Sequence, residues 1–173
     1  SGLGINRMNY SATARTFVWD SGEDAGTVVK GDSVNFNEDI RVGGATTGDD
    51  SGMYPDSVLE KYVRYNGFPQ NTYGHRTASI HLSPGTYRLR LVCSPNSTYK
   101  NSTEFMKVQT VVDGVANVFE LPDGYDVIGN LTRWLEQEIT VPESGMFELQ
   151  WGMENATKGW MEVPLNIIEI EET

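Results

Sequence analysis

The chain offers very little sulfur or imidazole chemistry. It contains one cysteine, Cys93, and two histidines, His75 and His81. A single cysteine excludes a disulfide framework and a cysteine zinc site, and two histidines are too few for a histidine-rich metal site. We therefore expect Cys93 to be a buried small hydrophobic residue.

Positive charge is also scarce. The 13 Lys and Arg residues are outnumbered by 24 Asp and Glu, which gives a net charge of −11. A chain with this balance lacks the basic field that displaces counterions from nucleic acid, so we expect no nucleic-acid partner. No apolar run approaches the ~20 residues of a membrane-spanning helix, so we also expect no insertion into a membrane.

The main pattern in the sequence is an alternation of apolar and polar residues with a period of two. Residues 87–93 place Tyr, Leu or Cys at every second position and Arg or Val between them. This pattern is typical of a half-buried antiparallel strand. Pro84 and Gly85 form a turn signal just before it, so we predict a hairpin over residues 78–93.

A second hairpin is indicated further along the chain. Asp113 and Gly114 separate two runs, 104–112 and 115–121, and Asp-Gly in this position is the strongest short-range hairpin signal. The last third continues in the same style up to a final strand over 160–170. About ten short strands with frequent turns predict an all-β sandwich or barrel.

One segment supports two interpretations. Residues 57–60 have the Ser-x-x-Glu pattern of a capping box, which favours a short helix. Residues 61–65 are rich in β-formers and precede an Asn-Gly turn signal, which favours a strand. Elsewhere no helical periodicity persists, and no linker or internal repeat is found. We predict one β-sandwich domain over residues 1–173.

Charge is unevenly distributed along the chain. Residues 61–110 hold seven Lys or Arg and one Glu, whereas residues 111–173 hold two Lys or Arg and 13 Asp or Glu. Arg88 and Arg90 fall on the polar face of one predicted strand, and glutamates fall on the polar faces of others. We expect cross-strand ion pairs between them. A functional charged groove is the alternative.

Sequence motifs of catalysis are missing. Residues 29–34 resemble the first block of GDSL hydrolases, but those enzymes also need a late Asp-x-x-His, and no histidine follows His81. There is no Gly-x-Ser-x-Gly elbow, Walker loop or His-Glu-x-x-His motif. A pair of carboxylates for glycoside hydrolysis has no sequence motif, so an enzyme of that kind stays open.

Aromatic residues beside polar ones are the best candidates for a binding site. Flat rings stack on the C–H faces of sugars, and amides or Arg bind the hydroxyl groups between them. Trp151 and Trp19 lie in apolar strands and are expected in the core, whereas alternation places Trp134 on a polar face. Partial burial as loop anchors is the alternative for the others. The candidates are Tyr73, Arg76, Tyr99, Trp134, Asn155 and Trp160.

Two stretches resemble a known fold family. Residues 78–91 are similar to the x-Leu-x-x-Gly-x-Tyr-x-Leu-x-Leu hairpin of galactose-binding-like jelly rolls, and residues 139–152 with 164–170 are similar to their closing strands. The resemblance implies a carbohydrate-binding module of the kind attached to secreted polysaccharide-degrading enzymes, notably of gut Bacteroidetes. Such modules often hold a structural Ca²⁺, and the matching acids here are Glu23, Asp24 and Glu169.

These observations lead to one expected function and two alternatives. We expect an extracellular, antiparallel jelly-roll β-sandwich that binds a polysaccharide or glycan without catalysis, next to catalytic or anchoring domains of a larger protein. The first alternative is a structural or adhesion domain without a small ligand. The second is a small glycanase or lyase.

Overall fold

The computed structural model describes residues 5–6, 9–11, 16–18, 24–29, 40–51, 56–59, 61–95, 103–130 and 133–173. Within these residues no helix is long and apolar enough to cross a membrane. The elements are β1 (Ile5–Asn6), β2 (Asn9–Ser11), β3 (Thr16–Val18), β4 (Asp24–Val29), β5 (Ile40–Val42), α1 (Asp56–Leu59), β6 (Lys61–Gly67), β7 (Tyr73–His81), β8 (Gly85–Val92), β9 (Met106–Val112), β10 (Val115–Val118), β11 (Leu135–Val141), β12 (Met146–Glu154), β13 (Met161–Leu165) and β14 (Ile167–Glu172).

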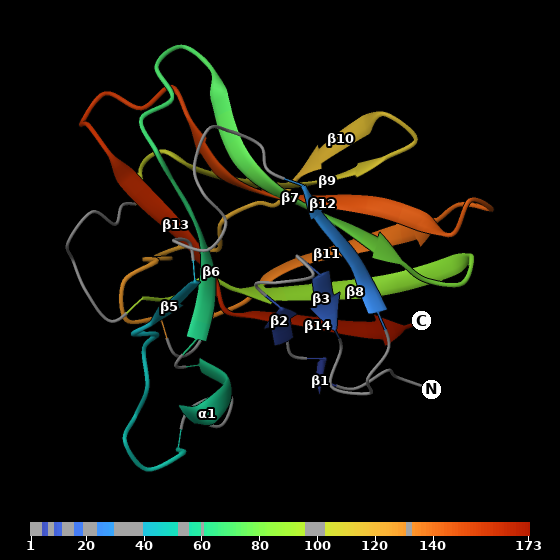
Figure 1. The fold of residues 1–173 in the computed structure, drawn as a ribbon, viewed down its shortest axis with the longest axis horizontal. Helices are drawn as coiled ribbons and strands as arrows, with labels where there is room; N and C mark the ends of the chain where they lie inside the picture. The colour runs from blue at the N-terminus through green and yellow to red at the C-terminus, as the bar shows by residue number, and fades with distance from the viewer. Residues whose placement is uncertain are drawn as a thin grey trace.

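The strands form antiparallel sheets that pack as a sandwich (Figure 1). One sheet has the order β1-β14-β8-β11, and the second has the order β10-β9-β12-β7-β4-β3-β2. A small third sheet, β13-β6-β5, lies at one side. Strands β1, β7, β8, β9, β10, β11, β12 and β14, renumbered one to eight, follow the orders 1-8-3-6 and 2-7-4-5. This is the strand order of a jelly roll, so the predicted fold is confirmed.

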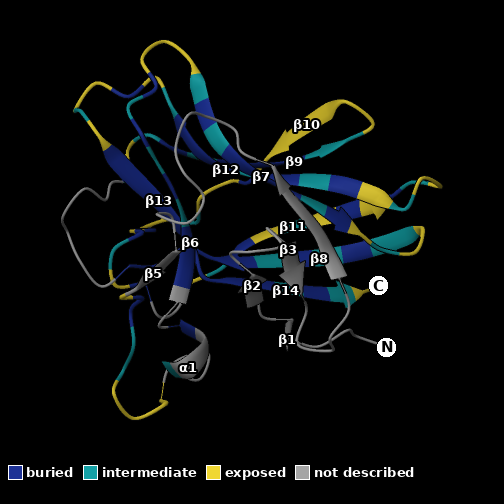
Figure 2. Ribbon diagram, viewed as in Figure 1, coloured by how far each residue is buried: buried dark blue, intermediate teal, exposed yellow. Residues whose placement is uncertain are grey.

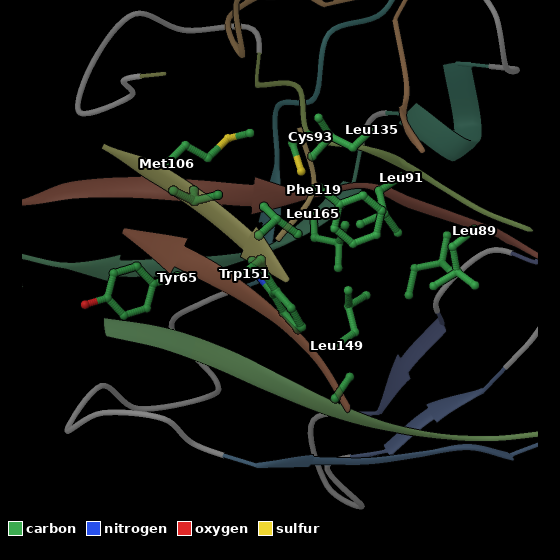
Figure 3. Packing of buried hydrophobic residues seen from close by; sticks show 14 of the residues in the cluster. Tyr65, Leu89, Leu91, Cys93, Met106, Phe119, Leu135, Leu149, Trp151 and Leu165 are labelled. Carbon is green, nitrogen blue, oxygen red and sulfur yellow. The ribbon is translucent and has the colours of Figure 1, made fainter. Parts of the chain in front are cut away.

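The core lies between the two main sheets and is built by the alternation seen in the sequence. Leu89 and Leu91 of β8 and Leu149 and Trp151 of β12 are fully buried and point into the same cluster (Figure 3). The indole of Trp151 donates to the backbone carbonyl of Val63, 3.2 Å away, which satisfies its polar group in the core. The predicted core position of Trp151 is confirmed, whereas Trp19 lies outside the described residues.

The outer face of the four-stranded sheet carries the predicted charge ladder. Arg90 pairs in register with Glu136 on β11 and with Glu169 on β14. Its Nε lies 2.6 Å from Glu136 Oε2, and its NH1 lies 3.5 Å from Glu169 Oε1. Arg88 is ion-paired with Glu171 on the same face. The cross-strand interpretation of these charges is therefore confirmed.

One of the two predicted hairpins forms, and the other does not. Strands β9 and β10 pair through a turn in which Asp113 has φ of 49° and Gly114 has φ of 78°, the left-handed conformations that a tight type I′ hairpin requires. Strands β7 and β8 lie in different sheets, so the hairpin over 78–93 is wrong. Both strands bury one face in the same core from opposite sides, and a local turn signal does not reveal which strand becomes the partner.

The ambiguous segment contains both of the expected elements. Residues Asp56–Leu59 form the single-turn helix α1, and Lys61–Gly67 form β6. The capping pattern and the β-rich run each determined their own part of the segment. The helix stops after one turn because the β-branched and aromatic residues that follow favour an extended backbone.

Candidate functional site

Two loops that are distant in sequence lie together at one end of the sandwich. They join β6 to β7 and β12 to β13, and both are at the top of Figure 1. The backbone N–H of Asn155 donates to the carbonyl of Thr72 at 3.0 Å, and that of Ala156 donates to Pro69 at 2.9 Å. These two hydrogen bonds hold the start of β7 and the end of β12 close together.

The polar face at this end belongs to the seven-stranded sheet. On β12, alternate residues such as Leu149 and Trp151 enter the core, so Glu148, Gln150 and Glu154 lie on the outer side. The same alternation sends the odd-numbered residues of β7 and β9 outward. We name as the Tyr73 face the outward side chains of Tyr73, His75, Lys107, Gln109, Glu148, Gln150 and Glu154.

Tyr73 is on β7, and its side chain lies across the neighbouring strand β12 toward β9. Its hydroxyl donates to the backbone carbonyl of Lys107 at 3.0 Å, so the side chain spans β12. Gly152 of β12 pairs with Lys107, and a Cβ there would lie 1.9 Å from the carbonyl oxygen of Gly74. Glycine is required at this close approach of two strands. Burial, with a smaller effect from Glu154, raises the pKa of Tyr73, so the phenol stays a donor.

A second ring and an ion pair flank Tyr73. The His75 ring is 4.7 Å from the Tyr73 ring at 31°, and its Nδ1 lies 3.0 Å from Thr77 Oγ1. Lys107 Nζ lies 4.8 Å from the centre of the Tyr73 ring and donates to Glu154 Oε2 at 2.6 Å. The result is a pair of rings in a fixed arrangement, bordered by opposite charges.

A row of amides continues the face away from the rings. Gln109 Nε2 donates to Gln150 Oε1 at 2.7 Å, and Gln150 Nε2 donates to Glu148 Oε2 at 3.3 Å. Gln109 is only 8% exposed, so this row is held by its neighbours. Amide and carboxylate groups fixed in this way can exchange hydrogen bonds with a polyhydroxylated ligand without first being ordered.

A hollow of about 360 Å³ adjoins the Lys107–Glu154 pair. Lys158, on the loop after β12, is ion-paired with Glu104, which lines the hollow. The hollow therefore combines apolar surface with two charged pairs. Its lining residues are Glu104, Phe105, Met106, Lys107, Val118 and Glu154.

The sequence-predicted binding residues are only partly brought together. Tyr73 is on the named face, and Asn155 and Trp160 lie on the loop that follows β12, where Trp160 is 55% exposed. Arg76 is wrong as a ligand contact, because β7 turns it to the core side, where it is 1% exposed. Tyr99 lies outside the described residues. As sugar contacts, Tyr73, Asn155 and Trp160 stay predictions.

Trp134 is separated from the other candidates. It lies on the outer side of the four-stranded sheet, against the small buried cluster of Leu59, Val92 and Ile167. The guanidinium of Arg90 lies 5.1 Å from the centre of its ring. Because the core separates the two outer faces, a single short ligand on the Tyr73 face does not reach Trp134.

The proposed calcium ligands are described only in part. Glu23 lies outside the described residues, and Asp24 is described only as backbone in β4. Glu169 is described, and its carboxylate is shared with Arg90, a cation that competes with Ca²⁺. Among the side chains placed by the structure, no group of three or more His, Cys, Asp or Glu could hold a metal. A calcium site therefore stays a prediction.

Several residues of the Tyr73 face were missed in the sequence. His75, Lys107, Gln109, Gln150 and Glu154 occupy alternate positions on strands, where polar residues are expected on any solvated face. We expected the binding residues to be aromatic side chains on loops instead. The available signal was the run of outward Glu and Gln residues on β12, without Lys or Arg between them.

No protein-family profile and no curated protein matches the chain. Several solved structures resemble it. A family 61 carbohydrate-binding module in complex with β-1,4-galactotriose is 12% identical, with 79% of this chain and 83% of that one covered and a TM-score of 0.43. The cleaved K1 adhesin domain of Lys-gingipain from Porphyromonas gingivalis W83 is 13% identical, with 85% and 90% covered and a TM-score of 0.42.

A third resemblance is to part of a larger enzyme. The CBM22-1–GH10 modules of the Clostridium thermocellum endo-1,4-β-D-xylanase 10B, complexed with xylohexaose, are 9% identical. The match covers 99% of this chain but 28% of that one, with a TM-score of 0.49. The structures that resemble this chain thus include carbohydrate-binding modules and an adhesin domain. With every one of these TM-scores below 0.5, the resemblances carry no argument about function.

Proposed function

We propose that this protein is a non-catalytic carbohydrate-binding module and that the Tyr73 face holds the glycan. The observation that carries the proposal is the adjacent, tilted rings of Tyr73 and His75 beside the amide row of Gln109 and Gln150 on one sheet face. Rings offer an apolar surface to the C–H groups of a sugar, and the amides hydrogen-bond its hydroxyl groups. A rigid sheet holds both at fixed positions.

Binding without catalysis is supported by the state of the acids near the hollow. A glycosidase needs one carboxylic acid to protonate the leaving group and a second carboxylate to assist. The described acids of the hollow, Glu104 and Glu154, are each bound to a lysine. Both carboxylates of the hollow are therefore already partnered by ammonium groups.

The second candidate function is a structural or adhesion domain, and strand β10 favours it. β10 is the edge of the seven-stranded sheet, and all four of its residues are exposed (Figure 2). Val115 is 69% exposed and Val118 is 48% exposed. An apolar edge strand is a surface on which another protein can add a strand.

The wider setting follows from the same proposal. A module of this kind acts outside the cell, where polysaccharides are found, and beside catalytic or anchoring domains of a larger protein. Both statements are proposals, and the full-length gene product would test them directly. A signal peptide with a neighbouring glycanase domain would support them.

Affinity electrophoresis in gels that contain β-1,4-galactan, xylan or mixed-linkage β-glucan tests the function. We expect retardation by at least one of these polysaccharides and no release of reducing ends. Replacing Gln150 or His75 with Ala should weaken binding by about 1–3 kcal/mol, as expected for a contact at the centre of a site. The same substitution at Thr140, exposed on the other sheet, is the control.

Three other results would contradict the proposal. Release of reducing ends would support the glycanase alternative. Absence of retardation in every gel would favour the structural domain. Retardation that the Gln150→Ala and His75→Ala variants leave unchanged would place the site elsewhere, and the same assay on Trp160→Ala and Trp134→Ala would then test the loop and the opposite face.

A further inference from the structure

Both lysines described at the Tyr73 face and its hollow are already bound to carboxylates. Lys107 Nζ lies 2.6 Å from Glu154 Oε2, and Lys158 is paired with Glu104. Glu148 adds a third carboxylate, which accepts a hydrogen bond from the Gln150 amide. Three carboxylates against two ammonium groups leave this surface with negative charge.

The described remainder of the sandwich does not reverse this balance. Its ion pairs also join arginines to glutamates that are held on the sheets: Arg64–Glu162, Arg88–Glu171 and Arg90 with Glu136 and Glu169. The formal net charge of the chain is −11, so the field around the face is negative as well. A polyanion that approaches the face is repelled over the Debye length of about 8–10 Å at ordinary salt.

Hydroxyl groups fit this surface better than carboxylates. A sugar hydroxyl both donates and accepts, so the oxygens of Glu148 and Gln150 and the nitrogen of Gln109 can all be satisfied by an uncharged ring. A uronate placed at the same position would set its carboxylate against Glu148 and Glu154. These groups are partly buried, where like charges repel more strongly than in bulk water.

We propose that the Tyr73 face selects uncharged glycans. The Lys107–Glu154 ion pair excludes polyuronates, because Glu154 neutralises the positive charge of Lys107 that would otherwise attract a uronate carboxylate. The inference rests on the proposed function of this face. It names the class of ligand and the pair of side chains that decides it.

The test uses chemically matched ligands. Soluble β-1,4-galactan and mixed-linkage β-glucan are each compared with their C6-oxidised forms, which have the same backbone and carry carboxylates. We expect wild-type protein to bind the oxidised form of its ligand at least ~10-fold more weakly than the plain form, because like charges across an interface are strongly unfavourable. Equal or tighter binding of the oxidised form would overturn the inference.

A single variant tests the role of the ion pair. Glu154→Gln keeps the shape of the side chain and leaves Lys107 unneutralised, so affinity for the oxidised glycan should rise by ~10-fold at low salt and return to the wild-type value at high salt. Glu104→Gln releases Lys158 in the same way and serves as a second variant. No rise in Glu154→Gln would overturn the role of the Lys107–Glu154 pair, whatever Glu104→Gln shows, and thermal melting checks that both variants are folded.

Glu143→Gln is the matched control for charge. It changes the net charge by the same amount, and it lies in the exposed turn before Met146, at the opposite end of β12 from Glu154. An equal gain of affinity in this control would assign selectivity to the charge of the whole molecule and overturn the role of the pair. Failure to bind any plain or oxidised glycan would instead mean that the proposed function itself is wrong.

Discussion

At the residue scale, burial removes Cys93 from thiol chemistry. The side chain is fully buried, and the phenol of Tyr125 donates to its backbone carbonyl at 3.0 Å. Burial raises the pKa of the thiol from 9.0 to about 12. The neutral thiol is therefore the folded form at physiological pH, and it is both hidden and unreactive.

We predict that native protein does not react with a thiol reagent at pH 8 and that urea-unfolded protein reacts at once. The raised pKa also makes stability depend on pH. Because the folded state holds the thiol proton more tightly than the unfolded state, this contribution to the free energy of unfolding is complete below about pH 9 and decreases as pH rises toward 12. Fast labelling of the folded protein would contradict the strand register that places Cys93 in the core.

For Tyr73 and Arg76, the position at which β7 begins decides which side chain reaches the candidate site. The sequence placed both in one polar loop, but β7 already begins at Tyr73. Within a strand, residues separated by an odd number point to opposite faces. Tyr73 therefore faces outward and Arg76 faces the core, a distinction that depends on where the loop ends.

At the element scale, β8 has one face in the core and one in the charge ladder. Replacing Leu91 with Ala should lower the free energy of unfolding by about 2–5 kcal/mol, because it leaves a cavity among fully buried neighbours. Replacing Arg90 with Ala should cost about 1 kcal/mol or less, because its ion pairs lie at the surface. Urea denaturation measures both, and similar losses at the two positions would contradict the assigned faces.

The two hairpin predictions differ in how local their signals are. In β9–β10 the turn residues themselves fix the pairing, because Asp113 and Gly114 adopt the conformations of a two-residue hairpin. After β7, the chain crosses to the other sheet, and the loop is held by a hydrogen bond from Leu82 N to Gly145 O of 3.0 Å. That bond comes from a segment about sixty residues away, so no local signal could reveal it.

At the scale of the whole molecule, a structural calcium ion stays a proposal carried by Glu23, Asp24 and Glu169. If it binds, a chelator should lower the melting temperature, and added Ca²⁺ should restore it, since a ligand of the folded state stabilises that state. Differential scanning fluorimetry measures both steps, and Glu169→Gln should reduce the effect. A melting curve that the chelator leaves unchanged would mean that the folded protein holds no structural calcium ion.

The sequence by itself determined the class of fold, the core of β8 and β12, the hairpin β9–β10 and the charge ladder. Each of these depends on a period-two pattern or a turn that is complete within a few residues. Tertiary structure decided that β7 and β8 lie in opposite sheets, that the loops around Thr72 and Asn155 meet, and that Tyr73 lies across β12 beside Gly152. The candidate site belongs to this second group, because its side chains come from three strands whose order along the chain differs from their order in the sheet.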